Sequence, residues 1–331
     1  MRVIAALPDP SAPLSRDAAA AAFAAILDGE VADAEIAAFL VNLSERGESA
    51  IEIAAAARAL RSRMLPIAAP AGAIDVCGTG GDGHHTLNVS TAVAIVVAAA
   101  GVPVAKHGNR AASSMAGAAD TLEALGLDLD RASRSAERTL AEIGIGFLFA
   151  AHHHPALRRL APIRRTIGRR TIFNLMGPLA NPAGVTRQLI GIARPDYVPV
   201  YADALATLGV EAAAIVAGED ALDELSTAGP SVAVNVGAAR LPERITPEDA
   251  GLPRHPLSAL RGGDAAHNAA ALRALLQGEA GAYRDAVILN AAAALMVAGR
   301  VETLAAGAEE AGELLDNGLA NTLLDCWIAN A

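Results

Sequence analysis

The chain has 331 residues, of which 53% are hydrophobic, 19% charged and only 3% aromatic, and its formal net charge is −10. At roughly one domain per 150 residues, this length indicates two domains, or one large α/β domain with an appendage. The acidic balance and the scarcity of aromatic side chains argue against nucleic acid or an anionic membrane as a partner.

Features that would direct the chain to a membrane or out of the cell are not evident in the sequence. It has no uninterrupted run of about 18 strongly apolar residues, so we expect no transmembrane helix. The apolar start is short and is broken by Pro8 and Pro10, which disfavours a signal peptide. Two distant cysteines, Cys77 and Cys326, make neither a disulfide framework nor a zinc site, so we expect a cytoplasmic protein.

The first part of the chain, residues 15–64, is expected to be helical. Within it, the apolar residues of the stretch 36–43 recur at i, i+3, i+4 and i+7, which places them on one helix face. Gly47 stands where a C-terminal cap belongs, and Ser49 with Glu52 forms a capping-box pattern that opens the next helix.

Pro66, Pro70 and Gly72 mark a boundary after these helices. We therefore expect a small all-helical domain over residues 1–70, joined by helices from about 155–185. Residues 71–331 are expected to form a large α/β domain.

From Ala73 onward the pattern changes to alternating strands and helices. A strand over 73–77, a glycine loop, a helix over 92–100, a strand over 102–105 and a helix from near Ser113 predict a β-loop-α-β unit with parallel strands. Further strands are expected at 188–192, 212–216 and 232–236, and alanine-rich helices over 269–330. The predicted class is α/β, with a mostly parallel central sheet flanked by helices.

The first loop carries four glycines between residues 78 and 83, directly after a predicted strand. Glycine lets backbone N–H groups close around phosphate oxygens with no side chain in the way. Ser90 and Thr91 then fall at the start of a helix, where free N–H groups and the helix dipole favour an anion. This loop is therefore expected to bind phosphate.

Two other interpretations of this loop fit its residues less well. Gly78-x-Gly80-x-x-Gly83 matches a dinucleotide-binding fingerprint, but residues 84–89 intervene before the helix, and the next strand ends in basic rather than acidic residues. A glycine turn without a ligand does not account for the metal- and anion-binding side chains that follow it, which are Asp82, Thr86, Asn88, Ser90 and Thr91.

The second strand leads into a run from Lys106 to Ser114 that contains two cations, an imidazole, an amide and two hydroxyls. Ligands of open α/β sheets bind at the carboxyl ends of the strands. Two anion-binding loops on adjacent strands suggest a substrate with two separated phosphate groups.

The motifs, taken in order, resemble those of anthranilate phosphoribosyltransferases. The resemblance rests on G-T-G-G-D-G from Gly78, N-x-S-T from Asn88 and K-H-G-N-R-A from Lys106. It continues at residues 119–126, 147–150, 154–156, 162–164, 170–179 and 223–224. Because it covers nearly the whole chain, helical N-terminus included, we regard it as specific.

The resemblance implies magnesium-dependent transfer of the phosphoribosyl group from phosphoribosyl pyrophosphate (PRPP) to the amine of anthranilate, a step of tryptophan biosynthesis. It implies that PRPP contacts Gly78, Gly81, Asp82, Thr86, Asn88, Val89, Ser90, Thr91, Lys106, His107, Gly108, Asn109, Arg110, Ala111, Ala112, Ser113, Ser114 and Ala118. For anthranilate, it implies contacts with Gly78, Asn109, His154, Arg164 and Gly177.

The same resemblance implies two Mg²⁺ ions per subunit, held by Ser90, Asp223 and Glu224. It implies catalytic roles for His107, Asn109 and Arg164, with His107 a possible acceptor of the surplus proton of the amine. Members of the family are usually homodimers through the helical domain, so a homodimer is expected. Where members often carry hydroxyl residues this chain has Ala116 and Ala118, and it has Ala221 at a position that is commonly glycine.

The residue types fit this chemistry. Carboxylate and phosphate oxygens are ligands that magnesium prefers, and neighbours in an extended segment such as Asp223 and Glu224 point to opposite sides. Arg164 offers a planar fork that matches a carboxylate. We expect the other arginines between 158 and 170 to form a solvated basic face, with Arg165 and Arg169 facing solvent or backbone, and the run His152 to His154 to bind no metal.

Two competing functions remain open at this point. A pyrimidine-nucleoside phosphorylase-like enzyme would share the fold and the second loop, but the Asp223–Glu224 pair and Arg164 favour the transferase. A non-catalytic paralogue that binds nucleic acid would lack the intact glycine loop and would tend to be basic.

Overall fold

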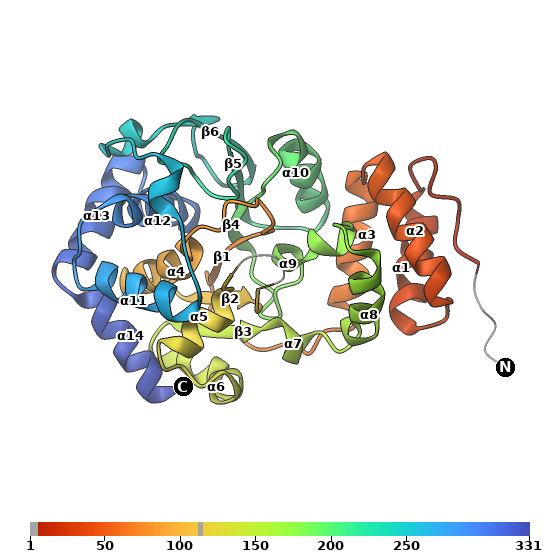
Figure 1. Ribbon diagram of the computed structural model, residues 1–331, viewed down its shortest axis with the longest axis horizontal. Helices are drawn as coiled ribbons and strands as arrows, with labels where there is room; N and C mark the ends of the chain where they lie inside the picture. Colours follow the sequence, from red (N-terminus) through yellow and green to blue (C-terminus); the bar gives the residue numbers. More distant parts are fainter. Residues whose placement is uncertain (1–5, 112–114) are drawn as a thin grey trace.

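The computed structural model describes residues 6–111 and 115–331. Figure 1 shows a small helical part at one end, and a larger part with a central sheet at the other. The small part contains three N-terminal helices, α1 (Arg16–Asp28), α2 (Asp33–Arg46) and α3 (Ala50–Arg61). Helix α8 (Leu157–Ile167), from much later in the chain, contacts α2, and its Leu160 and Ile163 belong to the same apolar cluster.

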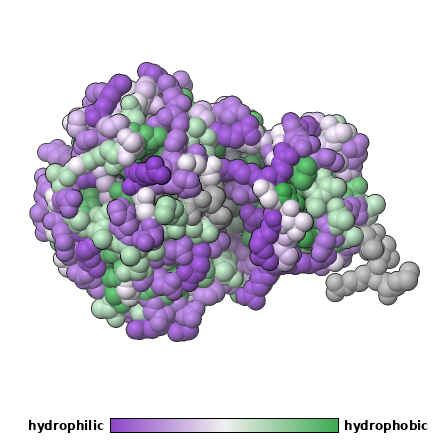
Figure 2. Space-filling view, in the orientation of Figure 1, coloured by the Kyte–Doolittle hydropathy of each residue, from purple (hydrophilic) through white to green (hydrophobic). Residues whose placement is uncertain are grey.

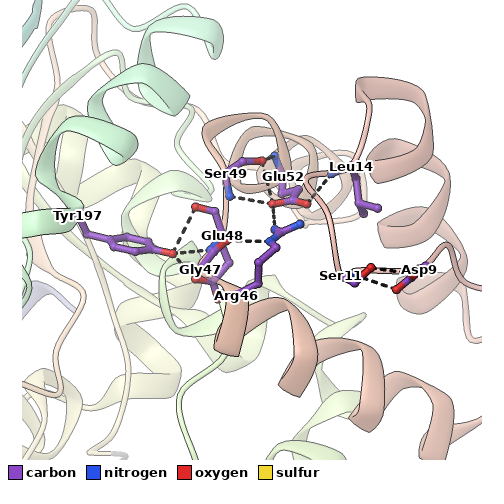
Figure 3. Close-up of polar contacts among 9 residues, drawn as sticks. All are labelled: Asp9, Ser11, Leu14, Arg46, Gly47, Glu48, Ser49, Glu52 and Tyr197. Atoms are coloured by element: carbon purple, nitrogen blue, oxygen red, sulfur yellow. Dashed lines mark hydrogen bonds and ion pairs between the residues drawn. The ribbon is translucent and has the colours of Figure 1, made fainter.

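The local signals in the helical part are confirmed. Gly47 ends α2, and Ser49 and Glu52 form the capping box of α3. Glu52 is fully buried, accepts a hydrogen bond from Leu14 N at 2.9 Å and pairs with Arg46 at 2.5 Å (Figure 3). Although burial opposes ionisation of Glu52, these hydrogen bonds hold its pKa below the usual value.

The expected sheet is also confirmed. Seven strands lie in the order β3-β2-β1-β4-β5-β6-β7, the first five parallel and the last two antiparallel to their neighbours. Their bounds are β1 Ile74–Gly78, β2 Val104–Gly108, β3 Ile145–Phe149, β4 Arg187–Gly191, β5 Ala212–Gly218, β6 Ser231–Gly237 and β7 Arg244–Ile245.

Helices cover both faces of this sheet, as Figure 1 shows. The remaining α-helices are α4 Val89–Ala99, α5 Ala118–Ala124, α6 Leu129–Glu142, α7 Ala150–His153, α9 Met176–Leu179, α10 Val198–Thr207, α11 Ala265–Leu276, α12 Ala282–Ala298, α13 Leu304–Asp316 and α14 Leu319–Asn330. Short 3-10 helices are η1 Ile172–Asn174, η2 Pro195–Tyr197, η3 Pro247–Ala250 and η4 Leu257–Leu260.

Alternate residues of the central strands enter two different cores. Leu189 and Ala214 pack with α4 and α12, whereas Ile190 and Ile215 belong to the cluster of α3, α8 and α10. The helical part therefore shares its core with one face of the sheet, which fixes it next to the strands. Within the described ranges, every helix falls short of the length and apolarity that a membrane span requires.

Some boundaries differ from those predicted by the sequence. Strand β2 starts later and includes Lys106 and His107, which are polar but only 2% and 6% exposed. Helix α5 begins at Ala118, where Asp120 accepts a hydrogen bond from Gly117 N at 2.9 Å. Its expected start, Ser113, lies outside the described residues. Strands β3 and β7 were not predicted.

Candidate active site

The parallel strands β1, β2, β4 and β5 all end in glycine, at Gly78, Gly108, Gly191 and Gly218. The loop after β5 crosses this edge and brings Asp223 against its neighbours. A Cβ on Gly191 would lie 1.6 Å from the Asp223 carbonyl oxygen, and one on Gly78 would lie 2.2 Å from Asp223 Oδ2. Glycine at both strand ends is therefore what lets the carboxylate loop approach.

The adjacent carboxylates of Asp223 and Glu224 reach two different parts of the first loop. Asp223 Oδ2 accepts a hydrogen bond from Gly80 N at 2.7 Å, and Glu224 Oε1 accepts one from Ser90 N, on α4, at 3.2 Å. This divergence agrees with the expected opposite orientation of the two neighbours. The pair thus brackets the glycine loop and the N-terminus of α4.

The surroundings of Asp223 and Glu224 destabilise the ionised form of both carboxyl groups. Burial raises the pKa of Asp223 to about 7, and repulsion from Asp82 adds to this. Burial followed by repulsion from Asp223 raises the pKa of Glu224 well above its usual value. A cation between the loop and these side chains would relieve both effects.

The donor set fits magnesium shared with a phosphate ligand. Among residues 6–111 and 115–331, no group of three or more His, Cys, Asp or Glu side chains forms a metal site made by protein alone. Magnesium is commonly bound through one or two carboxylates plus substrate phosphates and water. Asp223 and Glu224, with the Ser90 hydroxyl beside them, match that pattern.

A buried lysine and a buried aspartate lie beneath this site. Lys106 Nζ donates to Val76 O at 2.9 Å and to Ser90 Oγ at 3.4 Å. Asp75, fully buried in β1, accepts hydrogen bonds from Asn181 at 2.8 Å and from His107 N at 3.2 Å. Burial raises the pKa of Asp75, and the charge of Lys106 opposes that rise.

His107 and His154 form a buried pair whose hydrogen bonds define their tautomers. His107 Nδ1 lies 2.8 Å from Gly177 O, and because a carbonyl oxygen accepts, this nitrogen carries the proton. The two Nε2 atoms are 3.2 Å apart, so His154 donates and His107 accepts. Burial lowers the pKa of His107 to about 3 and that of His154 to about 4.

The sequence left open whether His107 accepts the surplus proton of the amine, and this arrangement argues against that role. Its free lone pair is already occupied by the His154 N–H, and a group with a pKa of about 3 is a very weak base near neutrality. The side chain is held by two hydrogen bonds and is 6% exposed, which suits a structural support.

The arginines of the α8 region divide into two groups. The Arg164 guanidinium, half-buried, makes no hydrogen bond or ion pair with any residue that the structure describes, and burial alone lowers its pKa. Arg165 is exposed, and Arg169 pairs with Glu45 at the surface. The expectation that these two neighbours face solvent is confirmed. An unpaired, half-buried guanidinium is suited to a carboxylate ligand.

The second loop is held mainly by hydrogen bonds and ion pairs to residues that lie close to it in the sequence. Asp120 accepts hydrogen bonds from Ala111 N and Gly117 N, both at 2.9 Å. The Arg110 guanidinium pairs with Asp120 and Glu123 and lies over the Phe149 ring, so it is already engaged by protein groups. Of the expected PRPP residues, Ala112, Ser113 and Ser114 lie outside the described residues.

The other expected PRPP residues differ in accessibility. The side-chain amide of Asn88 forms hydrogen bonds with Ala116, Thr121 and Asn268. Val89 and Thr91 are buried, with 2% and 1% of their surface exposed. The groups that remain accessible are Gly78, Gly81, Asp82, Thr86, Ser90, Gly108, Asn109 and Ala118. Gly177 is exposed, although its carbonyl oxygen accepts from His107.

The sequence analysis did not predict the role of one residue. Arg170 belongs to the run of arginines expected to form a solvated basic face, but it is half-buried and its Nη1 donates to Gly81 O at 2.9 Å. No local signal separates it from Arg169, because the difference arises only when the segment after α8 folds against the first loop.

The chain matches two family models that together span it. Residues 3–64 match the helical bundle domain of a glycosyl transferase family, and residues 71–321 match the a/b domain of the same family. Anthranilate phosphoribosyltransferase of Novosphingobium aromaticivorans is 67% identical over 324 residues, which cover 98% of each chain. That of Rhodospirillum rubrum is 52% identical, covering 96% of this chain and 92% of the relative.

Solved structures agree with these sequence matches. Anthranilate phosphoribosyltransferase from Thermus thermophilus superposes with a TM-score of 0.91 at 45% identity, covering 97% of this chain and 96% of that one. The Saccharomyces cerevisiae enzyme, solved in complex with PRPP and Mg, gives a TM-score of 0.87 at 27% identity, covering 96% of this chain and 93% of that one. The resemblance noted in the sequence is confirmed, and the chain belongs to the anthranilate phosphoribosyltransferase family.

Proposed function

We propose that this protein transfers the phosphoribosyl group of PRPP to the amine of anthranilate, giving N-(5-phosphoribosyl)anthranilate and pyrophosphate. The observation that carries the proposal is the presence of two complementary groups, a carboxylate pair at the sheet edge and an unpaired guanidinium on α8. Asp223 and Glu224 bracket a glycine loop and have raised pKa values that a cation would relieve, while the half-buried Arg164 on α8, unpaired among the described residues, suits an anion. The family assignment supplies the two substrates.

The reaction breaks the bond between C1 of the ribose and pyrophosphate and forms a bond from C1 to the amine nitrogen. Glycosyl transfer of this kind passes through an oxocarbenium-like transition state, with negative charge growing on the leaving group. Bound magnesium supplies charge stabilisation for the departing pyrophosphate. Backbone N–H groups of the glycine loop and of the start of α4, other than those of Gly80 and Ser90 that donate to the carboxylates, would face the same growing charge.

The chain's own groups would act chiefly by positioning. The aromatic amine is neutral before attack, so no strong general base is needed, and alignment of the two reactants supplies much of the rate. Arg164 would hold the anthranilate carboxylate, with Gly78, Asn109, His154 and Gly177 around the ring. The surplus proton would pass to water or to the released pyrophosphate, since His107 is occupied by His154.

The roles assigned to the remaining residues belong to this proposal. The first loop and the start of α4 would hold the pyrophosphate part of PRPP. The run from Lys106 to Ser114, with Ala118, would hold the rest, using backbone groups where Arg110 is already paired. Two magnesium ions per subunit would be bound by Ser90, Asp223 and Glu224, since the two carboxylates contact different segments of the loop.

We further propose that the protein acts as a homodimer in the cytoplasm. Association through the helical part would cover apolar side chains such as Ile51, which is 44% exposed on α3. A light-scattering mass that doubles the chain mass would agree with this. A monomer mass at every concentration would rule the dimer out.

The function is tested directly by the fluorescence of anthranilate. The purified protein with PRPP and magnesium should consume anthranilate and release pyrophosphate in equal amounts. Removal of magnesium by a chelator should stop the reaction. Turnover of a pyrimidine nucleoside with inorganic phosphate, with no turnover of anthranilate, would refute the proposal and favour the phosphorylase-like alternative.

A further inference from the structure

Arg170 connects the helical part of the molecule with the first glycine loop. Its backbone carbonyl accepts a hydrogen bond from Ser44 Oγ, on α2, at 3.2 Å. Its guanidinium donates through Nη1 to Gly81 O at 2.9 Å. A single residue, separated by more than 80 positions from either partner, thus contacts both.

The contact between Arg170 and the loop leaves no spare room. Gly81 has a φ of +76°, and a Cβ built on it would lie 2.4 Å from Arg170 Nη1. The neighbouring Gly80 N–H donates to Asp223 at 2.7 Å. Displacement of the guanidinium would therefore act on the same short stretch of backbone that orients the carboxylate.

Polar links cross between the two parts at several places, among them those from Arg58 to Thr207 O and from Arg61 to Leu179 O. A cavity also lies between the two parts, lined by side chains of both, and within it the hydroxyls of Thr79 and Thr171 are buried without a hydrogen-bond partner among the described residues. Figure 2 shows the surface hollowed between the larger and the smaller part. Beside the apolar core that the two parts share, the geometry around this cavity depends on specific hydrogen bonds.

Two such links lie at the lining of this cavity. One runs from Ser44 through Arg170 to Gly81. The other joins the α2–α3 turn to η2, where Tyr197 donates to the Glu48 carboxylate and accepts from Glu48 N at 2.6 Å (Figure 3). Only the first reaches the glycine loop.

The charge of Arg170 also suits this position. Within the described residues its guanidinium forms no ion pair, and burial lowers its pKa, an effect that the charges of Asp223, Asp82 and Glu48 oppose. Its charge in turn favours ionised Asp223. It therefore balances acidic groups of the loop without neutralising either carboxylate by direct pairing.

We propose that Arg170 is a positioning residue that holds the first glycine loop ready for the pyrophosphate part of PRPP and couples this loop to the helical part that carries Arg164. The identity of the ligand rests on the proposed function. Because Arg164 precedes Arg170 by only six residues, order imposed on one segment is transmitted to the other. Binding of PRPP and binding of anthranilate should then reinforce each other.

Isothermal titration calorimetry with magnesium pyrophosphate and with magnesium PRPP tests this proposal. Loss of a charge-assisted hydrogen bond in Arg170→Ala should weaken both ligands by about 10- to 100-fold. The factor by which PRPP tightens anthranilate binding should fall toward one. Arg170→Lys keeps the charge but loses the planar fork, so it should restore part of the affinity.

Matched variants separate positioning from folding. Arg169→Ala removes the adjacent arginine and its surface pair with Glu45, and should bind both ligands as the wild type does. Ser44→Ala, which removes only the link to α2, should leave pyrophosphate affinity nearly intact and reduce the coupling between the substrates. Hydrogen exchange at residues 79–83 should rise in Arg170→Ala and not in Arg169→Ala.

Unchanged affinity for magnesium pyrophosphate in Arg170→Ala would overturn the proposal. The proposal would also be overturned if the alanine and lysine variants lost affinity for both substrates equally and had a lowered Tm. That pattern is expected of a purely structural residue. If the wild type failed to bind anthranilate, the proposed function would fail. The comparison of Arg170→Ala with wild type for magnesium pyrophosphate would still decide the role of Arg170.

Discussion

The two sides of the active site differ in electrostatic character. On the loop side, Asp82, Asp223 and Glu224 gather acidic charge next to backbone N–H groups, and the carboxyl pKa values of the pair rise. On the α7–α8 side, the imidazoles of His107 and His154 are neutral. The loop side holds several carboxyl groups that burial and mutual repulsion disfavour as anions. The histidine pair on the other side carries no negative charge.

The difference explains what each side accepts. Crowded, half-buried carboxylates are stabilised by a divalent cation, which can then be shared with phosphate oxygens. Burial of the Arg164 guanidinium, which has no protein partner among the described residues, strengthens its attraction to a carboxylate, because solvent screens it less. A dianionic phosphate would meet repulsion on the first side without the cation, and under the proposed function an aromatic carboxylate would find its partner on the second.

Removal of the carboxylate pair should have the largest effect. The double variant Asp223→Asn, Glu224→Gln should lose at least about 100-fold in magnesium-dependent turnover, because charge stabilisation by a metal contributes several kcal/mol. Circular dichroism should show an intact fold. Glu219→Gln, which changes only a surface carboxylate paired with Arg244, is the matched control. Full activity of the double variant across a magnesium titration would contradict the assignment.

Removal of the guanidinium should have the next largest effect. Arg164→Ala should weaken anthranilate by about 10- to 100-fold, the value of one charge-assisted hydrogen bond, and leave PRPP nearly unchanged. Lysine at this position should rescue only in part, since it loses the fork. Arg165→Ala, at an exposed position, should do much less. Kinetics with each substrate varied in turn provide the measurement.

The neutral histidine pair gives a pH-dependent prediction. In the folded protein the pKa values of His107 and His154 are about 3 and about 4, below the ordinary value of 6.5. The unfolded chain therefore binds protons first, so this contribution to stability is present above pH 6.5 and is lost as the pH falls toward 4 and 3. Nitrogen NMR should find both rings neutral at pH 6; a midpoint near 6.5 for His107 would disprove the assignment.

The smallest effect is expected at Ala221, on the carboxylate loop. It has a φ of +66°, a left-handed conformation that costs an L-residue about 1–2 kcal/mol. Because glycine loses more chain entropy on folding, Ala221→Gly should raise the free energy of unfolding by only about 0.5–1 kcal/mol. Ala270→Gly, at an exposed position within α11, should instead lower it. Denaturant unfolding of both variants distinguishes these signs.

The sequence predicted the parts of the molecule that depend on local pattern. The glycine loop, the capping box at Ser49 and the place of Ser90 in the first turn of a helix follow from residue types at fixed spacings, and all three are present. The end of β2 was misplaced because Lys106 and His107 are polar, and their burial depends on partners such as Val76 O and Gly177 O. Those partners come together only in the folded chain.

Properties that arise from contacts between distant segments could not be predicted. Whether His107 acts as a base depends on His154, which lies after another strand, and whether Arg170 is solvated depends on Gly81. The resemblance identified the reactants, but it carried no information on these pairings. The structure therefore changed the interpretation of individual side chains more than that of the fold.

The central claim is that the two sides of the site hold the two substrates separately. Calorimetric titration of two variants, Arg164→Ala and the double variant of Asp223 and Glu224, with magnesium pyrophosphate and with anthranilate tests it most directly. We expect the arginine variant to lose anthranilate and keep pyrophosphate, and the carboxylate variant to do the reverse. If Arg164→Ala lost pyrophosphate and kept anthranilate, Arg164 would belong to the phosphate side, and the two substrates would not be held separately.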